Sequence, residues 1–282
     1  MKDIWEEQLK WLESGEPFVL ARVIRTWRSA PRKSGAGMLI GKGTAKDSLP
    51  KVLGSVSGGC IEGAVIEEAL DVLESEKSRK LSFGVEDDLA LSVGLSCGGE
   101  VTVLLEKHWA FSTMLETKNV WSALQSCIRN NEPAILISAL PDESRASADN
   151  KSPLLILPEG ENVGGMQNNL EEASALAKEA YKERENRIVE IGGEEYFIQI
   201  FPRRDQLLII GAGHITIPLV RFAKELDFLT VVIDPRTVFA NPDRFPVPPD
   251  QLIAKWPDDV LPDFPLNEDT YAILLTHDPK ID

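Results

Sequence analysis

A stretch near the carboxyl end of the chain limits the possible fold more than any other part of the sequence. Residues 206–210, Gln-Leu-Leu-Ile-Ile, form an almost wholly apolar run, which predicts a strand buried on both faces of a parallel sheet. The turn Gly211–Thr216 follows, then a helix expected over 217–226 and a second buried strand over 229–233. Asp234 ends this strand, near the distance of about 20 residues that separates the first glycine from the acid in dinucleotide-binding units. This order predicts a Rossmann-type βαβ unit.

Four residues of this unit are candidates for contact with a nucleotide. Gly211 would allow the tight turn, and Gly213 would allow the close approach of a pyrophosphate group. His214 either contacts a ligand phosphate or fills the first helical turn, and Asp234 is placed to bind a ribose hydroxyl. Thr216 stands where a third glycine or alanine is usual, so we expect the helix to lie farther from the strand. NAD or NADP is one predicted ligand, and a unit that serves only dimerisation is the alternative.

The sequence after Asp234 contains few further elements. Two more strands are expected over 251–254 and 271–275, and the sequence stops at Asp282. A doubly wound sheet usually has about five or six strands, so either the sequence is a fragment or another chain covers the open edge of the sheet. From that open edge we predict a homodimer. Arg236, two residues after Asp234, leaves the choice between NAD and NADP open.

A second glycine-rich stretch, Gly54–Gly63, carries a cysteine. The apolar residues before it indicate the end of a short strand, and those after it recur at helical spacing. A loop of small residues between a strand and a helix leaves backbone N–H groups at the positive end of the helix dipole, where an anion can bind. We therefore expect Ser57, Gly58, Gly59 and Cys60 to form a ligand pocket, with the Cys60 thiol inside it.

A similar loop recurs at Leu95–Glu100, Leu-Ser-Cys-Gly-Gly-Glu, directly before a stretch with strong β propensity. Cys97, Gly98 and Gly99 thus repeat the arrangement of a cysteine beside paired glycines. Two cysteines in similar loops suggest a shared site for a soft ligand rather than one isolated nucleophile. Cys60 and Cys97 are the candidate reactive residues. We expect them to line one cleft that faces the carboxyl edge of the Rossmann sheet, in the same chain or in a partner chain.

The third cysteine, Cys127, lies in a helical pattern over 120–128 and is expected to be a small buried apolar residue. No histidine accompanies the cysteines at the spacing of a tetrahedral zinc site, so the sequence predicts no set of metal ligands. No Gly-Lys-Ser/Thr follows the glycines, which excludes a phosphate-binding Walker loop.

The chain is expected to form a mixed α/β domain over 1–203 and the Rossmann-type domain over 204–282. The boundary falls in the polar, proline-containing segment Pro202–Asp205. Within the first domain, the alternating apolar residues of Phe18–Trp27 predict a strand. The basic loop Arg28–Gly37 follows, and its cations either face an anionic ligand or are simply solvated.

Composition argues against several classes of protein. The chain has 282 residues and a formal net charge of −15, which disfavours a nucleic-acid partner. Three scattered cysteines do not make the disulfide framework of a secreted protein, and the acidic first residues do not resemble a signal peptide. No apolar run approaches the length of about 18 residues that a membrane span needs. We expect a cytoplasmic protein that binds neither nucleic acid nor membrane.

Taken in order, four motifs resemble the XdhC/CoxI family. They are Gly54–Glu62, Leu95–Gly99, Gly211–His214 and Thr276–Pro279. The two cysteine motifs are similar to the amino-terminal part of that family, and the carboxy-terminal domain is similar to its Rossmann domain. The resemblance covers nearly all of the chain, although the middle third carries no distinctive motif.

The resemblance implies an accessory factor for xanthine dehydrogenase and related molybdenum hydroxylases rather than a catalyst with its own turnover. Such proteins are thought to bind the molybdenum cofactor (molybdopterin) and to protect it while a cysteine desulfurase helps to add a terminal sulfur. They are also thought to help insert the cofactor into the apo-enzyme. By this resemblance, Cys60 and Cys97 would handle the cofactor or the sulfur. Molybdopterin carries a phosphate and a metal centre, which suit anion-binding amides and a soft sulfur ligand.

Two other hypotheses compete with this one. The first is an NAD(P)-dependent oxidoreductase with a reactive cysteine, which rests on Gly211, Gly213 and Asp234. The second is a scaffold that only docks the target dehydrogenase, for which both thiols would be dispensable.

Overall fold

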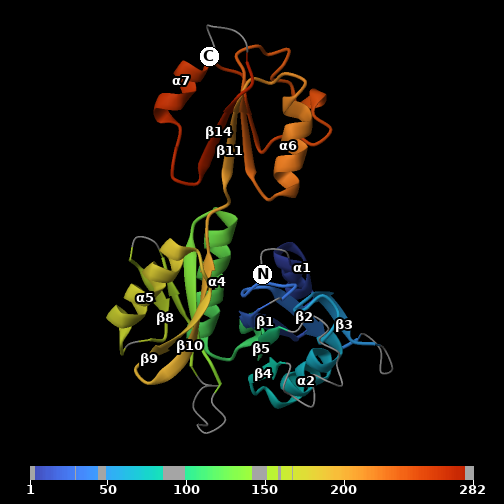
Figure 1. The fold of residues 1–282 in the computed structure, drawn as a ribbon, viewed down its shortest axis with the longest axis vertical. Coiled ribbons are helices and arrows are strands. Elements are labelled where there is room, and N and C mark those ends of the chain that lie inside the picture. The colour runs from blue at the N-terminus through green and yellow to red at the C-terminus, as the bar shows by residue number, and fades with distance from the viewer. Residues whose placement is uncertain are drawn as a thin grey trace. The chain divides into compact units, whose positions relative to one another are not determined.

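The computed structural model describes residues 4–28, 30–43, 49–84, 99–141, 151–157, 160–166 and 168–276. The chain divides into two compact units, residues 1–202 and 203–282. Within the described residues, the first unit contains two five-stranded sheets and the second unit one four-stranded sheet (Figure 1). A mixed α/β amino-terminal part followed by a Rossmann-type sheet was predicted, and this fold class is confirmed.

The first sheet of unit 1 is antiparallel, with strand order β3-β2-β1-β5-β4. Its strands are β1 (Phe18–Trp27), β2 (Gly37–Gly41), β3 (Lys51–Gly54), β4 (Arg79–Phe83) and β5 (Glu100–Lys107). The helix α2 (Glu62–Ser75) covers one face through Val65, Ala69 and Val72, which recur at the spacing of one helical face. The alternation in β1 places Val19, Ala21 and Val23 against this helix.

The other face of the first sheet belongs to an aromatic-rich core. Phe18 and Leu20 of β1 pack there with residues of α1 (Trp5–Glu13), the short 3-10 helix η2 (Trp109–Phe111) and α4 (Leu115–Arg129). Because β1 is buried on both faces and is paired on both edges, it is the central strand of this sheet.

The second sheet of unit 1 has strand order β8-β7-β6-β10-β9. Its strands are β6 (Ala134–Ala139), β7 (Leu154–Ile156), β8 (Asn162–Gly164), β9 (Arg187–Ile191) and β10 (Glu194–Phe201). The helix α5 (Leu170–Glu183) packs on it through Ala173, Ala177 and Ala180, whose small side chains allow close approach. The strands β9 and β10 form an antiparallel hairpin across Gly192 and Gly193.

Unit 2 is a parallel sheet with strand order β13-β12-β11-β14. Its elements are β11 (Gln206–Ile210), α6 (Thr216–Glu225), β12 (Leu229–Ile233), η4 (Pro242–Arg244), β13 (Gln251–Ile253), α7 (Pro257–Val260), η5 (Leu261–Asp263) and β14 (Thr270–Leu274). The βαβ order β11–α6–β12 is the one that the apolar runs predicted. Gly211 and Asp234 therefore both follow the carboxyl ends of neighbouring strands.

Within the described parts of the chain, every helix is too short or too polar to cross a lipid bilayer.

Candidate functional site

Three connections of the first sheet meet at one end of it. Gly54, the last residue of β3, pairs with Met38 near the start of β2, so the loop from Gly54 to α2 begins beside the β1–β2 loop. At the same end, Trp27 at the close of β1 pairs with Glu100 at the start of β5. Phe83, the last residue of β4, pairs with the neighbouring Val101. This end of the sheet therefore gathers the Cys60 loop, the basic loop over 28–36 and the start of β5.

The Cys60 loop is organised by the side chain of Glu62. Its carboxylate accepts hydrogen bonds from four consecutive backbone amides: those of Val56 at 3.3 Å, Ser57 at 2.9 Å, Gly58 at 3.0 Å and Gly59 at 2.8 Å. The hydroxyls of Ser55 and Ser57 also donate to it, at 2.8 and 2.6 Å. A residue in the first turn of α2 thus folds back over the loop that precedes it, and closes the loop around a negative charge.

These donors change the acidity of the carboxyl group. Partial burial by itself would raise the pKa of Glu62, but the hydrogen bonds from Ser57 and Ser55 prevail and lower that pKa to about 2. The sequence predicted free amides at Ser57, Gly58 and Gly59 that could bind an anionic ligand. In the structure these amides donate to the Glu62 carboxylate instead. The physical reason is local: the carboxylate lies only three to six residues from those amides.

Cys60 lies half-buried at the rim of this loop. Its amide and that of Ile61 donate to the Ser57 hydroxyl at 3.1 and 3.2 Å, which fixes the backbone on either side of the thiol. The side chain packs at the edge of the apolar cluster under α2. Apart from its chain neighbours, a Cβ added at Gly59 would meet nothing within 4 Å, so the loop is open at the residue before Cys60.

The structure describes Cys127 but not Cys97. Cys97 and Gly98 lie outside the described residues, so the shared cleft of Cys60 and Cys97 stays a prediction. Gly99 is buried directly before β5, at the same end of the sheet as the Cys60 loop. Cys127 is buried in α4, as predicted, and burial raises the pKa of its thiol.

Arg22, in the middle of β1, is a fully buried cation that joins the two sheets of unit 1. Its guanidinium group forms an ion pair with Glu106 at 2.6 Å and donates to Gln199 and Ser138, each at 3.0 Å. It also lies over the ring of Trp109, 4.9 Å from the centroid. Burial lowers the pKa of Arg22, and the negative charge of Glu106 opposes that shift. Sequence analysis did not single out this residue.

His108, at the end of β5, is buried among aromatic rings and is neutral. Burial and then the positive charge of Arg22 lower its pKa to about 3. Its Nε2 lies 2.9 Å from Nε2 of Gln8, and its Nδ1 accepts from the amide of Ala110 at 3.2 Å. These contacts give His108 a structural role in unit 1.

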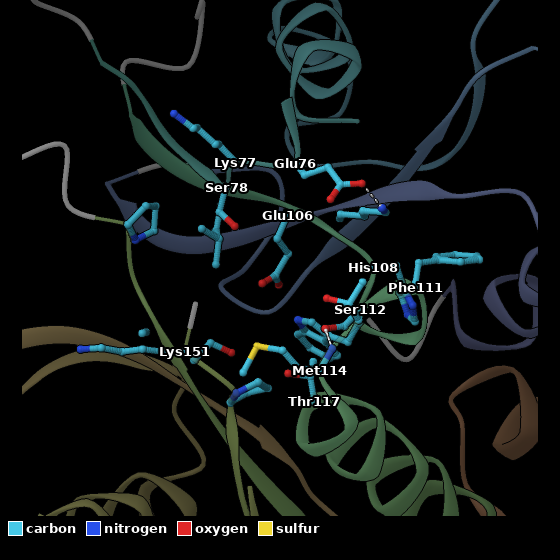
Figure 2. A pocket seen from close by; sticks show the side chains of 18 residues that line it. Glu76, Lys77, Ser78, Glu106, His108, Phe111, Ser112, Met114, Thr117 and Lys151 are labelled. Atoms are coloured by element: carbon cyan, nitrogen blue, oxygen red, sulfur yellow. Dashed lines mark hydrogen bonds and ion pairs between the residues drawn. The ribbon is translucent and has the colours of Figure 1, made fainter. Parts of the chain in front are cut away.

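A cavity of about 440 Å³ opens beside this buried group, and Figure 2 shows its lining. The carboxylates of Glu106 and Glu76 line it together with Lys77, Lys107 and Lys151. Lys107 forms an ion pair with Glu76, and Lys151 with Glu194. The cavity therefore carries charges of both signs. It lies at the Lys107 end of β5, whereas the Cys60 loop lies at the Glu100 end.

In unit 2, Asp234 is fully buried and its carboxylate already holds four donors. Oδ2 accepts from the Ala212 amide at 2.7 Å and from Nη2 of Arg236 at 2.8 Å. Oδ1 accepts from the backbone N and the Nε of Arg236, both at 2.9 Å. Burial alone would raise the pKa of Asp234, but the bonds from Arg236 and the Ala212 amide lower it. The ribose-binding role predicted for Asp234 would require one of these bonds to open.

The glycines of the same turn differ in the space around them. Gly211 has φ +104°, and a Cβ there would lie 2.7 Å from Cγ2 of Thr276, so this position requires glycine. A Cβ at Gly213 would meet nothing within 4 Å, and His214 beside it is exposed. Thr216 is fully buried, and its hydroxyl donates to the Gly211 carbonyl at 2.6 Å. The threonine is accommodated because its polar atom closes the turn.

The fold and the site together define an α/β protein in which a cysteine-bearing glycine loop on an antiparallel sheet is joined in one chain to a Rossmann-type unit. Comparison with known proteins gives the family. Residues 11–84 match the XdhC and CoxI family, and residues 207–282 match the XdhC Rossmann domain. The chain belongs to the XdhC/CoxI family.

Relatives and a solved structure agree with this assignment. A probable xanthine dehydrogenase subunit of Bacillus subtilis is 26% identical over 273 residues, which is 94% of this chain and 74% of that protein. The molybdenum cofactor insertion chaperone PaoD of Escherichia coli is 32% identical over 108 residues, 38% of this chain and 32% of PaoD. A crystal structure of a xanthine dehydrogenase from Bacillus halodurans has a TM-score of 0.70 and 26% identity, and the match covers 96% of this chain and 74% of that one.

Proposed function

We propose that this protein binds the molybdenum cofactor at the Cys60 end of the first sheet and helps to insert it into a xanthine dehydrogenase-type enzyme. Family membership and the similarity to PaoD support an accessory role of this kind. The observation that carries the proposal is the Cys60 loop. Glu62 holds its backbone in place, and the thiol of Cys60 stands half-buried at the rim of the loop.

The chemistry of this loop suits the metal end of the cofactor. A thiolate is a soft ligand, and a half-buried position leaves it accessible while limiting contact with water. The amides of Gly58 and Gly59 are already bound to Glu62. The loop can therefore bind the cofactor through the Cys60 thiol but not through free amides. The phosphate of the cofactor must then be bound by other residues.

The test is retention of the cofactor by the purified full-length chain. Molybdopterin is measured through the fluorescence of its oxidised form, and molybdenum by elemental analysis, after expression in a cofactor-producing host. We expect Cys60→Ala to reduce the bound molybdenum about tenfold or more, because the metal loses a covalent ligand. Cys127→Ala is the matched control, since that thiol is buried in α4 away from the loop.

Cys97→Ala tests the second thiol in the same assay. If Cys60→Ala and Cys97→Ala both retained the cofactor, and sulfuration of the target enzyme were undiminished, the proposed role of the thiols would be wrong. We also propose a cysteine desulfurase as a partner and a homodimer as the working form. Both can be tested by pull-down and by light scattering against the 31.2 kDa mass of one chain.

NAD(P) binding by unit 2 remains a second candidate activity. The open space at Gly213 favours it, whereas the four donors on Asp234 disfavour the usual contact with a ribose. Calorimetric titration with NAD and NADP decides the question, and no heat with either ligand would exclude it.

A further inference from the structure

A groove of about 550 Å³ lies between the β1–β2 loop and the second sheet of unit 1. Residues 31–36 form one wall, and Arg184, Asn186 and residues 199–202 form the rest of the lining. The groove adjoins the Cys60 loop, because a Cβ on Gly58 would lie 3.5 Å from Cβ of Pro31. Pro31 is thus shared between the groove and the edge of the Cys60 loop.

The charge of this groove is opposite to that of the chain. Three cationic residues line it, Arg32, Lys33 and Arg184, and none of its lining residues, all of them in the described part of the chain, is acidic. The whole chain has a formal net charge of −15, so such a cluster of positive charge departs from its surroundings. The polar cavity of Figure 2 differs, since the carboxylates of Glu76 and Glu106 line it.

Two acidic residues flank Arg184 in the sequence but do not line the groove. Glu183 and Glu185 flank Arg184 along the chain, and both lie within ion-pair distance of Arg187, Glu185 at 4.0 Å. Neither of them lines the groove. The charged side chains of the lining itself are therefore all positive.

The loop that carries Arg32 and Lys33 is held against the second sheet. The side-chain amide of Asn186 donates to the Ser34 carbonyl at 2.7 Å, and its Oδ1 accepts from the Ile200 amide at 2.8 Å. Gln199 also contacts the Gly35 carbonyl at 3.4 Å. Gly35 has φ +90°, and a Cβ there would collide with Asn186. The wall of the groove is thus fixed before any ligand binds, which reduces the entropy lost on binding.

We propose that this groove binds the phosphate monoester of a pterin cofactor whose metal end lies at Cys60. A phosphate monoester carries a charge of about −1.5 to −2 at neutral pH and presents several acceptor oxygens, which suits a site with three cations. Pro31 places the groove next to the Cys60 loop, so one extended ligand can reach both. This inference rests on the proposed function for the identity of the ligand, and assigns the anionic end of that ligand to residues outside the glycine loop.

The test uses the oxidised, metal-free pterin, so that no contact between metal and thiol contributes. Its binding to the full-length protein is followed by fluorescence anisotropy, with and without the phosphate group. We expect removal of the phosphate to weaken binding about tenfold or more, as for the loss of charge-assisted hydrogen bonds. Arg32→Gln combined with Lys33→Gln should weaken binding of the phosphorylated form alone, and Arg184→Gln should do so to a smaller degree.

Lys10→Gln combined with Lys42→Gln is the matched control. It removes the same charge from exposed lysines outside the groove and should leave both affinities unchanged. Arg32→Lys with Lys33→Arg keeps the charges and should restore most of the binding. Equal affinity of the wild-type protein for the two pterins would overturn the proposal, and so would an equal loss in the control. Neither outcome bears on the proposed role of Cys60, because the retention of molybdenum tests that role in a separate assay.

Discussion

The two glycine loops of this protein both join a strand to a helix, yet they treat negative charge differently. In unit 1, Glu62 accepts four loop amides and two hydroxyls. In unit 2, Asp234 accepts only the Ala212 amide from the loop, and Arg236 supplies the other donors. The first loop is therefore closed around its own anion, whereas the carboxylate of Asp234 binds only one amide of the second loop.

This difference shows that glycines before a helix do not by themselves define a site for an anionic ligand. The position of the nearest carboxylate decides whether the amides are available. Glu62 belongs to the helix that the loop precedes, so it reaches the amides directly. Asp234 belongs to the next strand and reaches only one of them. Four measurements, in order of decreasing expected effect, test this comparison.

The largest effect is expected at the start of the first loop. Gly54 has φ +84°, and a Cβ there would lie 2.5 Å from the Gly37 carbonyl oxygen and 2.8 Å from Cγ2 of Ile4. Gly54→Ala should lower the free energy of unfolding of unit 1 by about 4 kcal/mol, through backbone strain and overpacking. Urea denaturation followed by tryptophan fluorescence measures this change. Gly213→Ala, in open space in the second loop, should change the stability of unit 2 by less than about 0.5 kcal/mol.

A smaller loss is expected when the internal anion is removed. Glu62→Ala leaves four amides and two hydroxyls to water, and should destabilise unit 1 by about 2 kcal/mol. Glu67→Ala is the control, since Glu67 is exposed on the same helix. A Glu62→Ala protein as stable as that control would show that the loop does not depend on its carboxylate.

Asp234→Asn should have a weaker effect, about 1 kcal/mol on unit 2. The asparagine oxygen can still accept from the Ala212 amide, and the exposed Arg236 can turn toward water. Hydrogen exchange of the amides in β11 and β12, measured on the full chain at increasing temperature, monitors the unfolding of unit 2. It gives the loss of free energy of unfolding. If Asp234→Asn lowered the free energy of unfolding of its unit more than Glu62→Ala does, the contrast between the two loops would be reversed.

The smallest expected effect is the change in the free energy of unfolding of unit 1 with pH. The pKa of Glu62 is about 2 in the folded protein, below its ordinary value of 4.5, so the folded state binds this proton less readily than the unfolded chain. Its contribution is complete above about pH 4.5 and is lost as the pH falls toward 2. The midpoint of urea unfolding, measured from pH 6 to 3, should fall less steeply in Glu62→Gln than in the wild-type protein. If the midpoint changed equally with pH in both proteins, the low pKa of Glu62 in the folded state would be contradicted.

Local patterns predicted much of the fold. The strand Phe18–Trp27 and the unit β11–α6–β12 were predicted with errors of one or two residues, because buried runs and helical spacing are properties of neighbouring residues. The three-residue strand Asn162–Gly164 was missed, since so short a segment carries no periodic signal. The organisation of unit 1 as two sheets was also missed, because it depends on pairings between distant residues.

The candidate site was predicted less completely. The Cys60 loop was located from its glycines, and Glu62 was visible in the sequence as the first acid of the helix, but its carboxylate was not expected to bind the loop amides. Arg22 offered a weaker signal, a charge among apolar residues of a strand. Its partner Gln199 lies 177 residues away, so no local pattern could identify the contact.

The buried position of Arg22 also determines how β1 can pair. Side chains alternate between the two faces of a strand, so a shift of one residue would turn this guanidinium group toward the apolar cluster under α2. There it would lose Glu106, Gln199 and Ser138, and an unpaired charge in an apolar core is strongly unfavourable. Arg22 therefore disfavours every register of β1 that would turn it to the other face of the sheet.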